Sequence, residues 1–143
     1  MYSWHTSLWL KYFSENHDVY LLSDERSYAK LQNYKNVKIF KHPGLIGKLI
    51  NYFSISSNLF RHLNKFLSTY IYVKMANDII KSEKIDIVHS HSLYYGYVAS
   101  KIADKNINII FSPLGSDVMV DALNNNFYKR MTDKVFSRIN IIT

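Results

Sequence analysis

The chain has 143 residues, no cysteine, and 18 Lys and Arg against 11 Asp and Glu, which gives a net charge of +7. Hydrophobic residues make up 48% of it and aromatic residues 15%, which excludes a disordered chain and predicts one globular domain over residues 1–143. The missing cysteines exclude disulfides, thiolate metal sites and cysteine nucleophiles, while the positive charge favours an anionic partner.

The first half of the chain alternates helical and strand patterns. Apolar residues at helical spacing predict a helix over residues 4–13, and short runs of β-branched and aromatic residues predict strands at 19–22 and 37–40. A weaker helical pattern covers residues 28–31. The spacing of leucines and aromatic residues then predicts a long helical region over residues 45–81.

The second half begins with a β-α-β pattern in residues 85–118. Apolar runs at 85–88 and 107–111 predict strands, and helical spacing over 94–103 predicts the connecting helix. Continuous hydrophobicity predicts strands that are covered on both faces, as in a parallel sheet. The loops that follow such strands form the ligand crevice, so the sequence predicts that residues 89–91 and 112–117 lie in two neighbouring functional loops.

A short helix after Asp117, a helix over residues 127–136 and a strand at 139–142 complete the predicted order. This alternation predicts the α/β class with a doubly wound, mostly parallel sheet. Such a domain normally opens with a central strand and a glycine-rich turn, and neither precedes Trp4. We therefore expect a sheet without its usual first strand, or a start that has been lost.

Two interpretations fit Gly115, Ser116 and Asp117. In the first, Gly115 makes the turn, and Ser116 or Asp117 caps the following helix. In the second, backbone N–H groups and the Asp117 carboxylate meet a hydroxylated substrate at the helix amino terminus.

His89 and His91 alternate along a strand end, so both are expected to point to one side, which also suits a metal ion. No nearby Cys, Asp or Glu completes a ligand set, so no metal site is expected and a polar strand end is the simpler interpretation. Tyr94, Tyr95 and Tyr97 could stack on a sugar, although an aromatic patch at a helix start is more often core.

Three segments resemble the amino-terminal domain of GT-B fold glycosyltransferases, in particular the retaining family 4. Residues 15–21 (ENHDVYL) are similar to that family's Gly-His-Glu-Val segment, and 85–91 (IDIVHSH) to its Pro-Asp-hydrophobic-hydrophobic-His-x-His segment. Residues 111–118 (FSPLGSDV) are similar to its Thr-Pro-x-Gly-Ser-Asp-Ile loop, with Leu114 where relatives often have histidine. The resemblance implies a Rossmann-like fold.

The resemblance implies a hexosyltransferase-type enzyme that moves a sugar from a nucleotide-sugar donor to a glycan or lipid-linked acceptor, in polysaccharide or glycoconjugate assembly. The family's donor-binding glutamates and basic residues lie in a second domain, so this chain is expected to be a truncated, acceptor-side domain that is inactive alone. No cofactor is expected, and the nucleotide sugar would bind only with a donor domain of the same or a partner chain. The alternative is a non-catalytic, glycosyltransferase-like binding or partner-dependent module.

No catalytic residue can be assigned, and the outcome at the sugar carbon, retaining or inverting, stays open. His5 is placed by the resemblance where donor and acceptor meet, although a lone histidine at a helix start is more often partly exposed. The candidate contacts to the acceptor, by this resemblance, are His5, His91, Tyr94, Gly115, Ser116 and Asp117.

The expected location is cytoplasmic, because no segment has the pattern of a signal peptide and no apolar run approaches the roughly 20 residues that cross a bilayer. Residues 45–81 combine an aromatic face with basic flanks, which fits either packing on a core or peripheral binding to an anionic inner membrane face. Dispersed lysines do not form the arginine-rich stripe of a nucleic-acid module, so no nucleic acid is expected.

Overall fold

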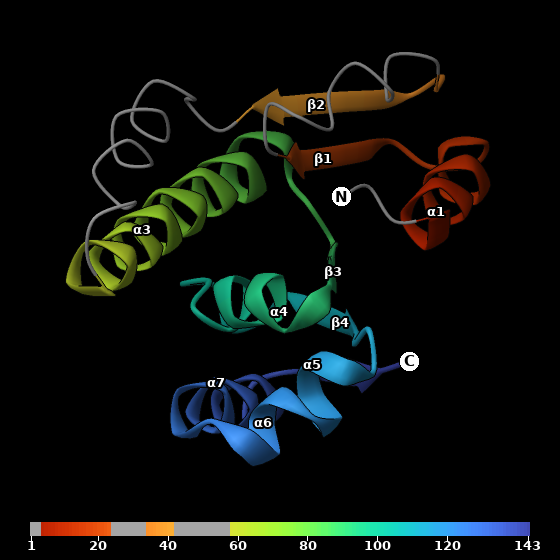
Figure 1. The fold of residues 1–143 in the computed structure, drawn as a ribbon. Coiled ribbons are helices and arrows are strands. Elements are labelled where there is room, and N and C mark those ends of the chain that lie inside the picture. Colours follow the sequence, from red (N-terminus) through yellow and green to blue (C-terminus); the bar gives the residue numbers. More distant parts are fainter. Residues whose placement is uncertain (1–3, 24–33, 42–57) are drawn as a thin grey trace. The chain divides into compact units, whose positions relative to one another are not determined.

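The computed structural model describes residues 4–23, 34–41 and 58–143 (Figure 1). The chain divides into two compact units, Met1–Ser68 and Thr69–Thr143. Helix α3, Asn58–Glu83, runs across this boundary. The helical pattern predicted at 28–31 and the first part of the predicted region 45–81 lie outside the described residues.

The first unit contains a helix followed by two parallel strands. Helix α1 spans Trp4–Ser14, β1 spans Val19–Ser23 and β2 spans Val37–Lys41, with Val19 opposite Val37. The rings of Trp9 and Phe13, one helical turn apart, stack at a centroid distance of 5.3 Å. These three elements confirm the helix and the strands that the apolar spacing predicts.

The second unit is built on a parallel sheet with the order β3-β4-β5. Together with the parallel pair in the first unit, it confirms the α/β class. Helix α4 connects β3 to β4, and three further helices connect β4 to β5 (Figure 1). The bounds are Ile87–His91 for β3, Ser92–Ser100 for α4, Asn108–Ser112 for β4, Ser116–Met119 for α5, Asp121–Asn124 for α6, Asn126–Phe136 for α7 and Ile141–Ile142 for β5.

One face of this sheet carries the core of the second unit. Phe111 of β4, which is fully buried, packs with Leu93 of α4 and with Met131 and Val135 of α7. Both crossovers connect neighbouring strands in the same direction, and right-handed crossovers then place α4 and α7 on the same side of the sheet. Glycine at position 96 allows α4 to lie this close to β4, because a Cβ atom at that position would be only 2.8 Å from Cε2 of Phe111.

The opposite face of the sheet carries the alternate residues of each strand. His89 and His91 of β3 lie on this face, opposite Ile110 and Ser112 of β4. Ile87, on the same face, is 54% exposed, which differs from the expectation that both faces of the strand are covered. The histidines therefore lie on the side of the sheet that α4 and α7 leave open.

The boundary between β3 and α4 differs from the predicted one. The pairing of β3 with β4 continues to His91 and Ser112, so residues 89–91 belong to the strand and the expectation of a loop there is wrong. The chain turns at Ser92, which has a positive φ of 67°, and α4 begins at once. A serine at a left-handed turn gives no signal in the hydrophobic pattern, which explains the displaced boundary.

Candidate functional site

The candidate site lies at the carboxyl ends of the three parallel strands of the second unit. His91 and Ser112 are the last residues of β3 and β4 and lie opposite one another, and Thr143 directly follows β5. The backbone N–H of Thr143 donates to the Phe111 carbonyl at 3.0 Å, which extends the pairing of β5 to the end of the sheet. We call this region the strand-end edge. It comprises residues 89–93, 112–118 and 143.

Three side chains at the strand-end edge form a hydrogen-bonded series across the sheet. Nε2 of His89 lies 2.8 Å from Oγ of Ser112, and Oγ of Ser112 lies 2.6 Å from Oγ1 of Thr143. We call this series the His89–Ser112–Thr143 network. It joins β3, β4 and the residue after β5, so it fixes these strand ends relative to one another.

His89 is half-buried and its ring lies beside that of His91. The ring centroids are 4.3 Å apart with a tilt of 36°. Burial, and to a smaller extent the neighbouring His91, lowers the pKa of His89 from 6.5 to about 4. His89 is therefore neutral at pH 7. No group of three or more His, Asp or Glu is arranged to hold a metal ion within residues 4–23, 34–41 and 58–143.

Asp117 connects the loop after β4 to the start of α4. Its Oδ2 accepts a hydrogen bond from the backbone N–H of Leu93 at 2.6 Å. The expectation that Ser116 or Asp117 caps its own helix is wrong, because Gly115 is the N-cap of α5 and no side-chain cap bond is made there. Gly115 has a φ of 84°, and the turn it makes precedes the carboxylate that caps α4 instead.

At the loop between β4 and α5, two backbone N–H groups are already hydrogen-bonded to carbonyl groups of the loop. The N–H of Ser116 donates to the Leu114 carbonyl at 3.1 Å, and the N–H of Met119 donates to the Gly115 carbonyl at 2.9 Å. Ser116 and Gly115 are exposed. Ser116 therefore offers its hydroxyl group to a ligand more readily than its N–H.

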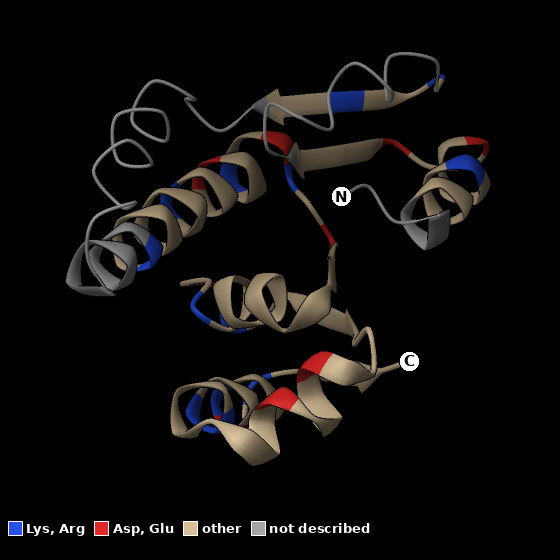
Figure 2. Ribbon diagram, viewed as in Figure 1, with Lys and Arg blue, Asp and Glu red and all other residues tan. Residues whose placement is uncertain are grey.

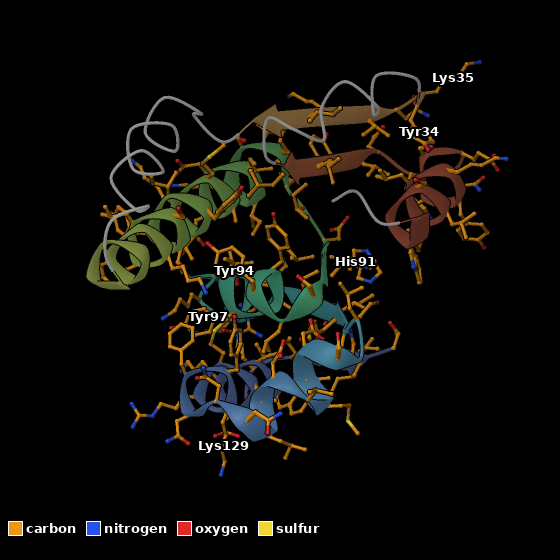
Figure 3. The ribbon with its side chains drawn as sticks, viewed as in Figure 1. Tyr34, Lys35, His91, Tyr94, Tyr97 and Lys129 are labelled. Carbon is orange, nitrogen blue, oxygen red and sulfur yellow. The ribbon has the colours of Figure 1, made fainter. Side chains whose placement is uncertain are left out.

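Tyr94 is oriented away from these groups. Its phenol oxygen accepts a hydrogen bond from Oγ1 of Thr69 in α3 at 3.4 Å, and its ring meets that of Tyr72 edge to face. Burial raises the pKa of Tyr94, and the bond from Thr69 partly opposes this. Figure 3 shows Tyr94 on the α3 side of α4 and His91 at the end of β3. The Tyr94 side chain thus packs against α3.

The structure brings four of the six predicted site residues to one edge: His91, Gly115, Ser116 and Asp117. His5 lies in α1, in the first unit, and its side chain is outside the described residues.

His89, Ser112 and Thr143 were not among the predicted site residues. The signal that could have found the first two is strand alternation, because His89 has the same parity as His91, and Ser112 ends the neighbouring strand.

The two segments that form most of the strand-end edge carry no permanently cationic side chain. Residues 87–93 and 112–121 contain no Lys or Arg. Figure 2 shows acidic residues on α5 and α6, which are Asp117 and Asp121, whereas α7 carries Lys129, Arg130 and Lys134. The edge therefore combines hydroxyl groups, imidazoles and a carboxylate without a permanently cationic side chain from these segments.

Comparison with known proteins identifies the family. The sequence matches the glycosyl transferase 4-like family over residues 1–143. No curated protein and no solved structure matches it significantly. Among the described residues, none of the helices combines the length and hydropathy that spanning a bilayer requires. Because the family match extends over all 143 residues, the chain belongs to the glycosyl transferase 4-like family.

Proposed function

We propose that this chain supplies the acceptor side of a glycosyltransferase and that the strand-end edge binds the acceptor sugar. Membership of the glycosyl transferase 4-like family supports a role in glycosyl transfer in general. The observation that carries the finer proposal is the chemistry of the edge, where hydroxyl groups, imidazoles and a carboxylate gather in two segments without Lys or Arg.

A sugar acceptor and a nucleotide-sugar donor need different partners. Sugar hydroxyl groups both donate and accept hydrogen bonds, so neutral imidazoles and side-chain hydroxyls suit them. A diphosphate instead requires arginine, lysine or free backbone N–H groups. The Ser116 N–H is already bonded to the Leu114 carbonyl. The edge therefore fits an acceptor better than a donor.

The roles at the edge follow from burial. His91 is partly exposed and Ser116 is exposed, so these two side chains are the proposed acceptor contacts. Asp117 is assigned a supporting role, because its Oδ2 is engaged with Leu93 and its Oδ1 is buried without a hydrogen-bond partner among the described residues. A ligand reaching Oδ1 would first have to displace the atoms that cover it.

In this proposal, residues 1–143 act as the acceptor-side domain of a two-domain enzyme. Another domain, or a partner chain, holds the nucleotide sugar. The acceptor is a glycan or a lipid-linked sugar. A non-catalytic binding module would share the acceptor site but would never form a complex competent for transfer, so in-frame coding sequence for a donor-type domain next to this chain separates the two possibilities.

The direct test is an NMR titration of the ¹⁵N-labelled chain. The probes are methyl β-glucoside, methyl β-galactoside and methyl α-mannoside, compared with UDP-glucose and GDP-mannose. We expect at least one glycoside to shift the amide signals of His91 and Ser116, and the nucleotide sugars to leave them in place.

Replacing His91 with alanine should weaken glycoside binding by about three- to tenfold, the effect of losing roughly one hydrogen bond. Replacing the exposed His17 of the first unit with alanine serves as the matched control. Tight binding of a nucleotide sugar at the edge, or glycoside shifts confined to other residues, would contradict the proposal.

A further inference from the structure

His89 lies behind His91 on the same face of β3, and its position is fixed from the neighbouring strand. Its Nε2 lies 2.8 Å from Oγ of Ser112, which in turn lies 2.6 Å from Oγ1 of Thr143. The His89 ring is 4.3 Å from the His91 ring, measured between centroids. The two imidazoles are therefore in contact, and the bond to Ser112 ties the His89 ring to β4.

A serine within hydrogen-bond distance of a histidine also suggests a nucleophile and its base. The surroundings of His89 argue against this role. Burial and the neighbouring His91 lower the pKa of His89 to about 4, and a base this weak does not remove the proton of a serine hydroxyl at neutral pH. Oγ of Ser112 is also engaged by Thr143 on its other side. The contact between His89 and Ser112 therefore holds the ring in place.

We propose that His89 is a positioning residue: anchored through Ser112 to Thr143, it supports the imidazole of His91 in the orientation that meets the acceptor. The link to the acceptor rests on the proposed function. The support of one ring by the other does not depend on it.

The hydrogen-bond chemistry of the network is compatible with either neutral tautomer of His89. If Nε2 carries the proton, it donates to Ser112, and Ser112 can donate to Thr143. If Nε2 is unprotonated, it accepts from Ser112, and Ser112 can accept from Thr143. The network therefore persists in both tautomers, and the neutral ring stays beside His91.

Two pairs of variants separate the effect of the hydrogen bond between His89 and Ser112 from the effect of the aromatic ring at position 89. His89→Phe keeps an aromatic ring beside His91 but loses the bond to Ser112, whereas His89→Gln keeps a hydrogen-bonding group but loses the ring. Ser112→Ala removes one oxygen atom from a half-buried side chain, and Ser112→Thr keeps the hydroxyl. The alanine variant is mild enough to retain the fold, which urea unfolding verifies.

The first measurement is the ¹H–¹³C signal of the His91 imidazole at pH 7 in the full chain. In Ser112→Ala and His89→Phe we expect this signal to move toward the position of an exposed histidine, while Ser112→Thr stays close to the original protein. An unmoved His91 signal in the folded Ser112→Ala and His89→Phe variants would overturn the proposal. Labelling of Ser112 by diisopropyl fluorophosphate would also overturn it, because it would reveal an activated nucleophile.

The second measurement is the affinity for the methyl glycoside that binds the original chain best. Ser112→Ala should weaken it about three- to tenfold through the displaced His91, and Ser112→Thr should restore it. If no glycoside binds the original chain, the proposed function fails, while the His91 signal still decides the positioning role. If a glycoside binds and its affinity is unchanged in Ser112→Ala despite a displaced His91, the positioning role in acceptor binding is refuted.

Discussion

Asp117 accepts a hydrogen bond from the backbone N–H of Leu93 at 2.6 Å, although the two residues lie 24 positions apart in the sequence. The N-cap residue of α4, His91, makes no side-chain cap bond of its own. The first turn of α4 is thus capped from the loop after β4. One carboxylate joins the two segments that carry the proposed acceptor contacts.

The first prediction concerns this bond. Asp117→Ala should lower the free energy of unfolding by about 1–2 kcal/mol, because it removes a helix cap that is also a charge-assisted hydrogen bond. Asp117→Asn keeps an oxygen that can accept the hydrogen bond from Leu93, so it should lower the free energy of unfolding by less than Asp117→Ala does. Urea unfolding measures both.

Asp121→Ala is the matched control, since this exposed carboxylate lies in the first turn of the short helix α6, whose N-cap residue is Val120. Equal losses in Asp117→Ala and Asp121→Ala would show that the bond to Leu93 contributes little to stability.

The elements that the sequence predicted best are those whose local pattern and tertiary burial agree. The apolar spacing of α7 predicted residues 127–136, and the helix spans Asn126–Phe136 because Met131 and Val135 face the core. The gathering of His91 and Asp117 at one edge was also predictable, since the carboxyl ends of parallel strands meet there.

The parts of the site that were not predicted depend on register and on distant contacts. The pairing of His89 with Ser112 requires the alignment of β3 with β4, which no single segment encodes. The Asp117 cap requires the turn at Gly115 and the turn at Ser92 together. Tyr94 was a candidate contact, but its place in the first turn of α4 directs it toward Thr69 instead.

The second prediction concerns the close packing of α4 on β4. Gly96→Ala would place a Cβ atom 2.8 Å from Cε2 of Phe111, whose side chain is fully buried and has little room to move. We expect a loss of about 1–3 kcal/mol in the free energy of unfolding, typical of an overpacked core. The double variant Gly96→Ala, Phe111→Leu should lose less than the sum of its single variants, because the shorter side chain relieves the clash. Additive losses in urea unfolding would contradict this contact.

The third prediction concerns the link between β4 and the start of β5. Oδ1 of Asn140 accepts from the N–H of Ile109 at 3.1 Å, and the N–H of Asn140 donates to the Ile109 carbonyl at 3.2 Å. Asn140→Ala leaves the N–H of a buried residue without this acceptor and should cost about 1–2 kcal/mol of unfolding free energy. Asn140→Asp keeps the oxygen and should remain close to the original stability in urea. If the aspartate variant were as unstable as the alanine variant, the bond between Asn140 and Ile109 would contribute little to stability.

The fourth prediction is a pH dependence of stability that arises from His89. Its pKa is about 4 in the folded chain against 6.5 for an unperturbed histidine, mainly because burial disfavours the charged ring and secondarily because of His91. Between these two pH values the unfolded chain binds more protons at this position than the folded chain, so the free energy of unfolding falls as the pH is lowered from about 6.5 toward 4.

Because carboxylates titrate in part of the same range, the informative quantity is the difference between the original chain and His89→Gln in urea unfolding at pH 7 and pH 5. The original chain should lose more stability than His89→Gln over this interval. Between pH 8 and pH 9, where His89 is almost entirely neutral in both states, the two chains should change in parallel, which serves as the control. Equal losses between pH 7 and pH 5 would mean that His89 is not held in the buried, neutral form that the network requires.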